Sequence, residues 1–331
     1  MRFSFTEEQD MFRDTVRELL ADVCPPDAVR AGWDNDDGRV PGLWPALAEM
    51  GMLSILAPEE SGGLGMDEVD LVRLLEETGY AGVPDPIMEH VAVAVPALAE
   101  AGASGHLAAA IAGETTCTIA LASGGDYVVD AEGADLVVVE RDGGLVAATE
   151  YRVEPQASID RSRRLGKLVA VDSPDPLSGA DPLLANDRAA LGTAAQCIGV
   201  ARRLLDSTVD YVSERRQFGK PVGTYQAVKH HLADVRLGIE FAAPLVHRAA
   251  WSVAHPESHD VTTRARDVSM AKAMAADAVD RACRAGLQCH GAIGYTDEYD
   301  LQLWLKRGWA LAAAHGDAPS HRDRVADALG I

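Results

Sequence analysis

The sequence has few aromatic residues and a shortage of positive charge. Only 5% of its 331 residues are Phe, Trp or Tyr, whereas 47% are hydrophobic. Such a composition suits long packed helices better than aromatic-rich strands. The 30 Lys and Arg residues face 51 Asp and Glu, and the formal net charge of -21 would repel a phosphate backbone over most of the surface. We therefore expect a mostly helical protein with no nucleic-acid partner.

Cysteine and long apolar runs are also scarce. The five cysteines are widely spread, odd in number and without CxxC spacing, which favours reduced thiols and predicts no metal site. No apolar run reaches the roughly 18 residues that a membrane span requires, and the N-terminus is charged. We expect a cytoplasmic protein that is not in a membrane. Neither GxGxxG nor GxxxxGK[ST] occurs, which excludes the usual nucleotide-binding loops.

Hydrophobic periodicity divides the chain into helices, a small β unit and helices again. A length of 331 residues suggests two or three packed units, at roughly 100–200 residues each. Thr6 and Gln9 form a capping-box pattern at the first helix, and a Gly-rich loop lies at 58–65. We predict a mainly α fold with a small β unit: an N-terminal helical domain at 1–112, a reduced middle β domain at 113–182 and a C-terminal helical bundle at 183–331. Helical spacing covers 43–52, 67–78, 87–112, 189–213, 226–253 and 261–287, and β-branched runs at 116–121, 135–140 and 167–171 predict strands.

Residues 214–226, ERRQFGKPVGTYQ, form the most informative segment. The segment ends one predicted helix, turns at 219–223 and opens another, which places an Arg, an aromatic ring and a Gln around one corner. An anionic ligand suits such a corner, because Arg offers a planar fork of donors and a helix N-terminus offers free amides. The alternative is an ordinary helix–turn–helix corner with solvated arginines and a buried Phe218.

Residues 288–296, QCHGAIGYT, form a second segment of interest at the end of a predicted helix. Gly291 and Gly294 allow positive φ and close backbone approach, so exposed amides could line a phosphate or nucleotide. The alternative is a glycine helix cap followed by a loop. Both interpretations stay open on this segment alone.

Together the two segments resemble the acyl-CoA dehydrogenase family. RxQFG is followed eight residues after its Phe by Gln226, and QxxGxxGY begins about 60 residues later. The N-terminal half is similar to that family's first helical domain, from Leu43-Trp44 through Gly51-Met52 to APEESGGLG at 57–65. The resemblance covers most of the chain in the right order. It implies a helical–β–helical fold that binds FAD between subunits and oxidises an acyl thioester to its α,β-enoyl form.

The resemblance also implies roles for particular residues. Arg215, Phe218 and Gln226 would meet the adenosine-diphosphate part of a flavin that the neighbouring subunit mainly holds. The segment with Gln288, Gly291 and Gly294 would approach the same flavin, with Ala292 in place of the family's second Gly.

The catalytic base that the family requires is missing from both expected positions. The reaction removes an α-proton while hydride leaves the β-carbon, and it needs a carboxylate held against the substrate. The family's usual Glu falls here on His315. A branch of the family uses a Glu about 29 residues before the Phe of RxxFG, which is Ala189 in this chain. We predict no catalytic residue and interpret His315 as a non-catalytic histidine at the edge of a decayed site.

Two further segments bear on the site. After residues 113–121 the family continues with Thr-Glu-Pro and Gly-Ser-Asp, whose hydroxyls and amides hold the flavin ring and substrate. Residues 122–127 read ASGGDY instead, so we expect this clamp to be lost. His255 and His259 of HPESH are predicted to lie in a solvated loop, because Pro256 prevents helical pairing of two metal ligands.

These features resemble the shorter, base-less subunit of heteromeric acyl-CoA dehydrogenases. In such α2β2 enzymes a longer partner carries the Glu and most of the flavin pocket, and the substrates are bulky acyl-CoA thioesters, including steroid side-chain esters. We therefore predict an FAD shared with a longer partner subunit and a flavoprotein electron acceptor. One alternative is a homo-oligomeric dehydrogenase with a relocated base at Asp187, Asp317 or His315. Another is a non-enzymatic scaffold that does not touch flavin.

Overall fold

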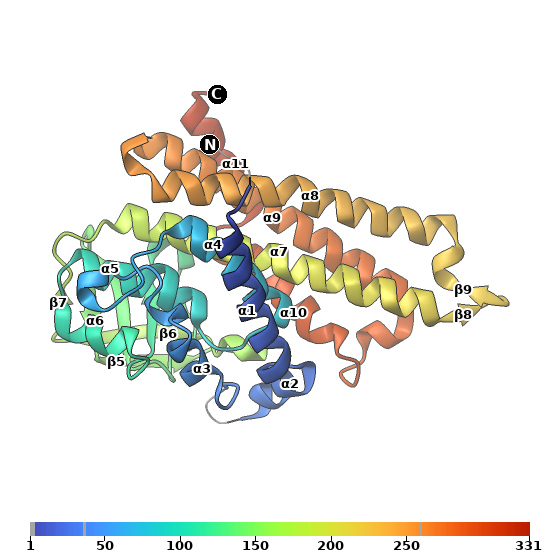
Figure 1. Cartoon of the computed structure of the whole chain (residues 1–331), viewed down its shortest axis with the longest axis horizontal. Coiled ribbons are helices and arrows are strands. Elements are labelled where there is room, and N and C mark those ends of the chain that lie inside the picture. The colour runs from blue at the N-terminus through green and yellow to red at the C-terminus, as the bar shows by residue number, and fades with distance from the viewer. Residues whose placement is uncertain (1–3, 36–37, 259) are drawn as a thin grey trace.

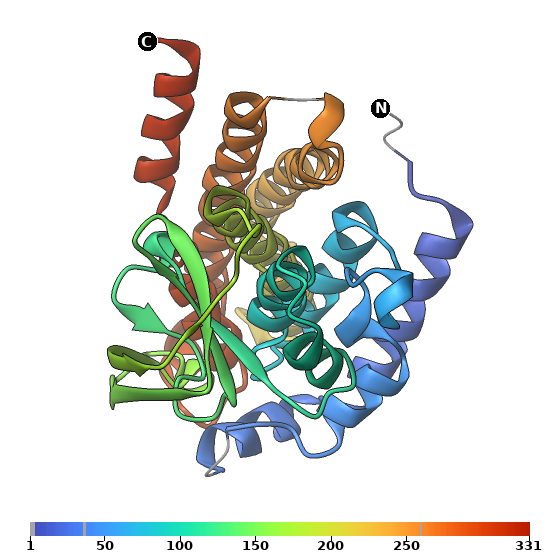
Figure 2. The same ribbon diagram turned by 90° about the vertical axis from the view of Figure 1, so that its left-hand side faces the viewer.

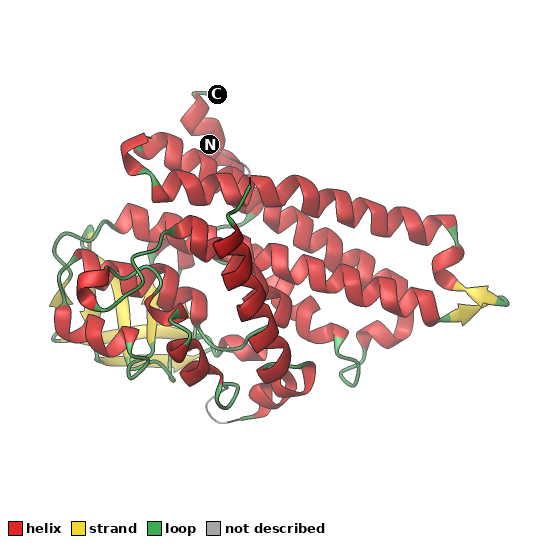
Figure 3. Ribbon diagram, viewed as in Figure 1, coloured by secondary structure: helices red, strands yellow, loops and turns green. Residues whose placement is uncertain are grey.

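Helices, strands and helices follow one another along the chain in the computed structural model, which describes residues 4–35, 38–258 and 260–331. Figure 1 shows the N-terminal helices and the strands at one end of the molecule and the long C-terminal helices extending to the other. In Figure 3 the strands gather at that first end, apart from one small hairpin at the far tip of the long helices. The predicted mainly α fold with a small β unit is confirmed.

The N-terminal region begins with the predicted capping box. The Thr6 hydroxyl accepts from the Gln9 amide at 3.2 Å, and the Gln9 side-chain oxygen accepts from the Thr6 amide at 2.9 Å. This reciprocal pair satisfies two amides that the first turn leaves without partners. The helices of this region are α1 (Glu7–Val23), α2 (Pro26–Asp34), α3 (Leu43–Glu49), α4 (Glu68–Ala81), α5 (Val95–Glu100) and α6 (Ser104–Ile111).

The single helix predicted at 87–112 is wrong. A π-helical segment, Glu89–Ala94, leads into α5, and residues 101–103 are not helical and separate α5 from α6. Pro96 lacks the N–H that an α-helix would bond to the carbonyl of residue 92, which favours the wider turn. Gly102 has φ +63, a conformation that ends α5. Hydrophobic spacing continues across both interruptions and therefore does not reveal them.

The β unit consists of two small sheets packed on each other. One sheet has the order β1-β3-β4-β7 with β1 and β3 parallel, and the other is antiparallel with the order β2-β6-β5. A small apolar cluster that includes Val128, Val137 and Ala148 fills the space between them. The three predicted strands correspond to β1, β3 and β6. The bounds are β1 (Cys117–Ala120), β2 (Tyr127–Val128), β3 (Leu136–Arg141), β4 (Gly144–Ala148), β5 (Glu150–Pro155), β6 (Gly166–Asp172) and β7 (Asp175–Pro176).

The C-terminal helices form a bundle on which the N-terminal region packs. Gly199 lets α7 lie directly on α4, since an added Cβ would stand 1.8 Å from the Glu76 carbonyl oxygen. Figure 2 shows α11 at the edge of the molecule, beside the bundle. No helix within the described ranges is both long and apolar enough to cross a bilayer. The bounds are α7 (Pro182–Glu214), α8 (Gln226–Ala254), α9 (Val261–His290), α10 (Leu301–Ala313) and α11 (Ala318–Leu329), with the hairpin β8 (Arg216–Gln217) and β9 (Lys220–Pro221) between α7 and α8.

Candidate functional site

The segment at 214–226 forms a hairpin that projects from the tip of the bundle (Figure 1). β8 and β9 pair Arg216 with Pro221 and Gln217 with Lys220. Phe218 and Gly219 form the two-residue turn with φ +50 and +82, as a tight hairpin turn requires. The Phe218 side chain is 89% exposed. The alternative that buried Phe218 in an ordinary corner is therefore wrong: the ring is exposed and meets the Tyr225 ring edge-on, with 6.5 Å between centroids.

Tyr211 and His290 join the two sequence segments. Their rings stack with centroids 4.2 Å apart, and the Tyr211 hydroxyl donates to the His290 carbonyl oxygen at 3.4 Å. Gly291 caps α9 with φ +64, which agrees with the cap interpretation, whereas Gly294 is a close-packed position where an added Cβ would meet the His290 Cβ at 3.1 Å. Sequence reasoning missed Tyr211. Its signal was its position one helical turn before Arg215, on the same face of α7.

A hollow of about 350 Å³ lies where the two segments meet. Three of the predicted cofactor residues line it, namely Arg215, Gln288 and Gly291. Phe218, Gln226 and Gly294 do not. Gln226 is the first residue of α8, whose next two residues line the hollow, and Phe218 lies at the tip of the hairpin.

The hollow offers unpaired donors to an anion. Within the described chain the Arg215 side chain makes no hydrogen bond or ion pair, whereas the Arg216 guanidinium donates to the Gly219 carbonyl oxygen at 3.2 Å. Tyr225 supplies no side-chain cap to α8, so the first amides of this 29-residue helix stay available beside the hollow. A guanidinium fork next to a helix N-terminus fits a phosphate or pyrophosphate group.

The first expected base position, His315, is buried and engaged. Only 6% of the residue is exposed, and its Nδ1 lies 3.1 Å from the Ser123 hydroxyl. Its carbonyl oxygen accepts from His321 Nε2 at 2.9 Å. Burial, together with the nearby cations Arg163 and Lys272, lowers the pKa of His315 to about 3. The imidazole is therefore neutral at ordinary pH and a weak base.

The other proposed base positions are also occupied by structural contacts. Ala189 is fully buried within α7. Asp187 forms ion pairs with Arg264 at 2.8 Å and with Arg324 at 3.2 Å. Asp317 caps α11 by accepting from the Ser320 amide and hydroxyl, and these bonds lower its pKa. Both carboxylates are therefore engaged by partners within the chain.

The segment in place of the family's flavin-ring clamp is folded back on the chain. The Ala122 amide donates to Glu140 Oε2 at 2.8 Å, and the Ser123 amide donates to Asn186 Oδ1 at 2.9 Å. The Ser123 hydroxyl meets His315. The two amides and the hydroxyl of this turn therefore already have partners within the chain.

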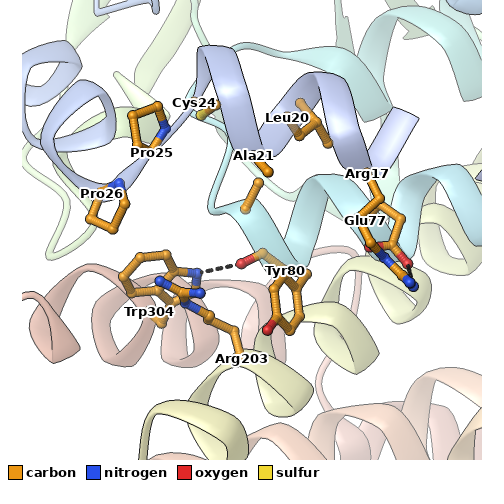
Figure 4. A pocket seen from close by; sticks show the side chains of 11 residues that line it. Arg17, Leu20, Ala21, Cys24, Pro25, Pro26, Glu77, Tyr80, Arg203 and Trp304 are labelled. Carbon is orange, nitrogen blue, oxygen red and sulfur yellow. Dashed lines mark hydrogen bonds and ion pairs between the residues drawn. The ribbon is translucent and has the colours of Figure 1, made fainter. Parts of the chain in front are cut away.

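A second cavity, of about 170 Å³, lies between α1, α4, α7 and α10 (Figure 4). The guanidinium of Arg203 lies 4.6 Å from the centre of the Trp304 ring and 5.5 Å from that of Tyr80. Trp304 Nε1 donates to the Tyr80 carbonyl oxygen at 2.9 Å. Burial raises the pKa of the Cys24 thiol on this cavity to about 12, so this cysteine is not a thiolate nucleophile. The sequence patterns did not single out this cavity, whose ring contacts tie α4 to the bundle.

Of the two histidines of HPESH, the structure describes His255. His255 ends α8, and its Nδ1 lies 2.9 Å from the Trp251 carbonyl oxygen. A short 3-10 turn, Pro256–Ser258, follows, and His259 lies outside the described residues. Across the described residues no three His, Cys, Asp or Glu side chains are grouped as metal ligands.

Comparison with known proteins decides the family. The model of the acyl-CoA dehydrogenase N-terminal domain matches residues 6–112, and that of the C-terminal domain matches residues 183–330. Acyl-CoA dehydrogenase IpdE2 of Mycobacterium tuberculosis is 36% identical over 313 residues, covering 94% of this chain and 92% of the relative. The chain belongs to the acyl-CoA dehydrogenase family. The resemblance inferred from its sequence is confirmed, and FAD is the cofactor of this family.

Solved acyl-CoA dehydrogenase structures share the fold over nearly the whole chain. A variant of the Tcur3481-Tcur3483 steroid acyl-CoA dehydrogenase has a TM-score of 0.88 at 25% identity and covers 98% of both chains. The ChsE4-ChsE5 complex of Mycobacterium tuberculosis also has a TM-score of 0.88, at 23% identity, covering 100% of this chain and 99% of that one. The helical–β–helical architecture therefore holds over this chain despite its altered 122–127 segment.

Proposed function

We propose that this chain is one subunit of an FAD-dependent acyl-CoA dehydrogenase, and that it lends binding groups to a flavin held mainly by a longer, Glu-bearing partner in an α2β2 assembly. The observation that carries the proposal is the contrast between two regions. Arg215 stands unpaired at an open hollow with Gln288 and Gly291. The amides and hydroxyl of residues 122 and 123 are used up within the chain.

The residues at the hollow suit the diphosphate part of FAD. The fork of Arg215 would pair with the phosphate charge, and the free amides of α8 would add hydrogen bonds. Phe218 and Gln226 would extend this contact, since the exposed hairpin reaches beyond the chain's own surface. When bound, the flavin accepts the hydride that leaves the β-carbon of the acyl thioester.

The absence of a base of its own is the second part of the proposal. His315 is buried and neutral, Ala189 has no titratable group, and Asp187 is held between two arginines. A proton acceptor supplied by the partner would resolve this lack. The engagement of these groups, and of Asp317 at its cap, weighs against a relocated base and hence against the homo-oligomeric alternative.

The remaining parts of the proposal concern substrate and assembly. One structural neighbour is a steroid acyl-CoA dehydrogenase, which favours a bulky acyl-CoA ester as substrate. Another is the ChsE4-ChsE5 complex, which favours a heteromer. We propose a flavoprotein as the electron acceptor. The division into domains at 1–112, 113–182 and 183–331 belongs to the same proposal, with 113–182 as the reduced domain.

Counting FAD tests the proposal directly. The chain is purified alone and after co-expression with a longer, Glu-bearing acyl-CoA dehydrogenase encoded beside it, and flavin absorbance is compared with protein mass. We expect no stoichiometric FAD on the isolated chain and one FAD per two chains in the complex. Stoichiometric flavin and acyl-CoA oxidation by the chain alone would refute the lending role. If Arg215→Ala leaves the FAD content and the activity of the complex unchanged, the scaffold alternative is favoured.

A further inference from the structure

The turn at residues 122–125 is held by three side chains from distant parts of the chain. Glu140 on β3 accepts from the Ala122 amide at 2.8 Å, and Asn186 in the first turns of α7 accepts from the Ser123 amide at 2.9 Å. His315, from the loop between α10 and α11, meets the Ser123 hydroxyl at 3.1 Å. Partners from three segments converge on two consecutive residues.

Asn186 is fixed by its other bonds. Its Nδ2 donates to Glu140 Oε2 and to the Pro182 carbonyl oxygen, both at 2.8 Å. With its nitrogen committed to two acceptors, its oxygen must face the Ser123 amide. Glu140 thereby serves as acceptor for both Asn186 and Ala122, and the two side chains act as one unit beneath the turn.

His315 closes the other side of the turn. An added Cβ on Gly124 would stand 3.5 Å from His315 Cε1, so ring and turn are in direct contact. The loop that carries His315 is fixed by Lys272, whose Nζ donates to the carbonyl oxygens of Ala312 at 3.0 Å and Gly316 at 2.8 Å. Lys272 is completely buried. The contact between ring and turn is therefore built on a rigid support.

We propose that Glu140, Asn186 and His315 are an internal substitute for a flavin ring, which seals this chain's own ring position and lets the subunit fold without a flavin there. The carboxylate and the amide oxygen are acceptors, as the carbonyl groups of a flavin are, and they satisfy the amides that an absent ring would leave without partners. This inference rests on the proposed function, because it takes the family's use of the turn as its reference.

A charge exchange between Asn186 and Glu140 tests the proposal without any flavin. Asn186→Asp sets two carboxylates against each other where a 2.8 Å hydrogen bond stood and removes the donor to the Pro182 carbonyl oxygen. Glu140→Gln added to it restores the donor and the acceptor between residues 140 and 186 alone. Hydrogen–deuterium exchange of the full chain is followed in the peptide that covers residues 119–127. Glu154→Ala, an exposed strand residue, is the matched control.

We expect exchange to rise about tenfold in Asn186→Asp, to return to within about threefold of the wild type in the double variant, and to stay unchanged in the control. Failure of Asn186→Asp to raise exchange would overturn the proposal, and so would a double variant that exchanges as fast as Asn186→Asp itself. If Asn186→Asp does not fold, a double variant that melts as the wild type does and protects the peptide still supports the pairing.

Adding FAD to the isolated wild-type chain separates this inference from the lending proposal. Saturating FAD should leave exchange at 119–127 unchanged, whereas new protection there would show a functional ring site and overturn the sealing. An FAD content in the complex that differs from one per two chains, with the exchange results as expected, would refute only the lending role.

Discussion

The hollow beside Arg215 and the turn at residues 122–125 contain similar groups in opposite situations. Both present backbone amides and a polar side chain, and the resemblance to the family implies a flavin contact at each. In the turn every one of these groups has a partner within the chain, whereas at the hollow Arg215 and the first amides of α8 have none from the described residues. Since folded chains normally satisfy their polar groups, a cluster left open indicates an external ligand.

The largest expected effect concerns Lys272, which holds the loop that carries His315 against the turn at residues 122–125. Lys272→Met removes a buried ammonium and leaves the carbonyl oxygens of Ala312 and Gly316 without their donor. Burial lowers the pKa of Lys272, whose amino group donates to both carbonyl oxygens. We expect a loss of about 3 kcal/mol in the free energy of unfolding, measured with urea. Lys229→Met on the exposed face of α8 should cost less than about 0.5 kcal/mol, and a similar small loss at Lys272 would contradict the account.

Arg215→Ala should give the next largest effect, this time on FAD binding at the hollow. Loss of a charged fork facing phosphate is expected to weaken FAD binding to the complex by about 10- to 100-fold, or roughly 1.5–3 kcal/mol. Arg216→Ala is the matched control, because that guanidinium donates to Gly219 in its own hairpin. Flavin release on dilution measures both variants. Equal weakening in the two would mean that general positive charge, and not the position of Arg215, attracts the cofactor.

The sequence predicted the parts of the fold that depend on local pattern. The capping box at Thr6, the long helices and the strands β1, β3 and β6 follow from residues adjacent in the chain. The interruption of 87–112 was not predictable from spacing, because apolar residues continue through the π-helical segment Glu89–Ala94. Strand β5, Glu150–Pro155, alternates charged and apolar residues as a half-exposed strand does, and it was missed because the strands were predicted from continuous β-branched runs.

The site was predictable only where its residues form a motif. Arg215 and Gln288 belong to recognisable segments, and the structure brings them to one hollow. Glu140 and Asn186 are an ordinary strand residue and an ordinary helix residue in sequence, 46 positions apart. Only the packing of β3 against the start of α7 makes them partners. Long-range polar pairs of this kind leave no trace in local patterns.

Acidification should destabilise the chain through His315, which contacts the turn at residues 122–125, and through His321, which donates to the His315 carbonyl oxygen. Burial lowers the pKa of His315 to about 3 and that of His321 to about 4, whereas an unfolded histidine titrates near 6.5. As pH falls below about 6.5 the unfolded chain takes up protons that the folded chain refuses, so stability present above that pH is lost toward pH 3–4. At about pH 5.5 each such histidine costs about 1.4 kcal/mol.

His315→Asn isolates one of these contributions. Asn accepts the left-handed backbone at this position, where φ is +52. Between about pH 7.5 and about 5.5 the variant should lose about 1.4 kcal/mol less stability than the wild type. His230→Asn, at an exposed position on α8, should leave the pH dependence unchanged. Parallel curves for His315→Asn and the wild type would mean that His315 is not buried as a neutral ring.

The smallest expected effect on stability comes from the tip of the hairpin. Phe218 is 89% exposed and adopts φ +50, a conformation that costs a residue with a Cβ about 1 kcal/mol. Phe218→Gly relieves that strain and removes little internal packing beyond an edge contact with the Tyr225 ring, whose centroid lies 6.5 Å away, so the free energy of unfolding should stay unchanged or rise by up to about 1 kcal/mol. Gln217→Gly, in the adjacent strand, should instead cost about 0.5–1 kcal/mol. If Phe218→Gly keeps its stability while the complex loses FAD, the Phe218 side chain acts on the neighbouring subunit. A stability loss above about 1 kcal/mol would show instead that Phe218 contributes to the packing of its own chain.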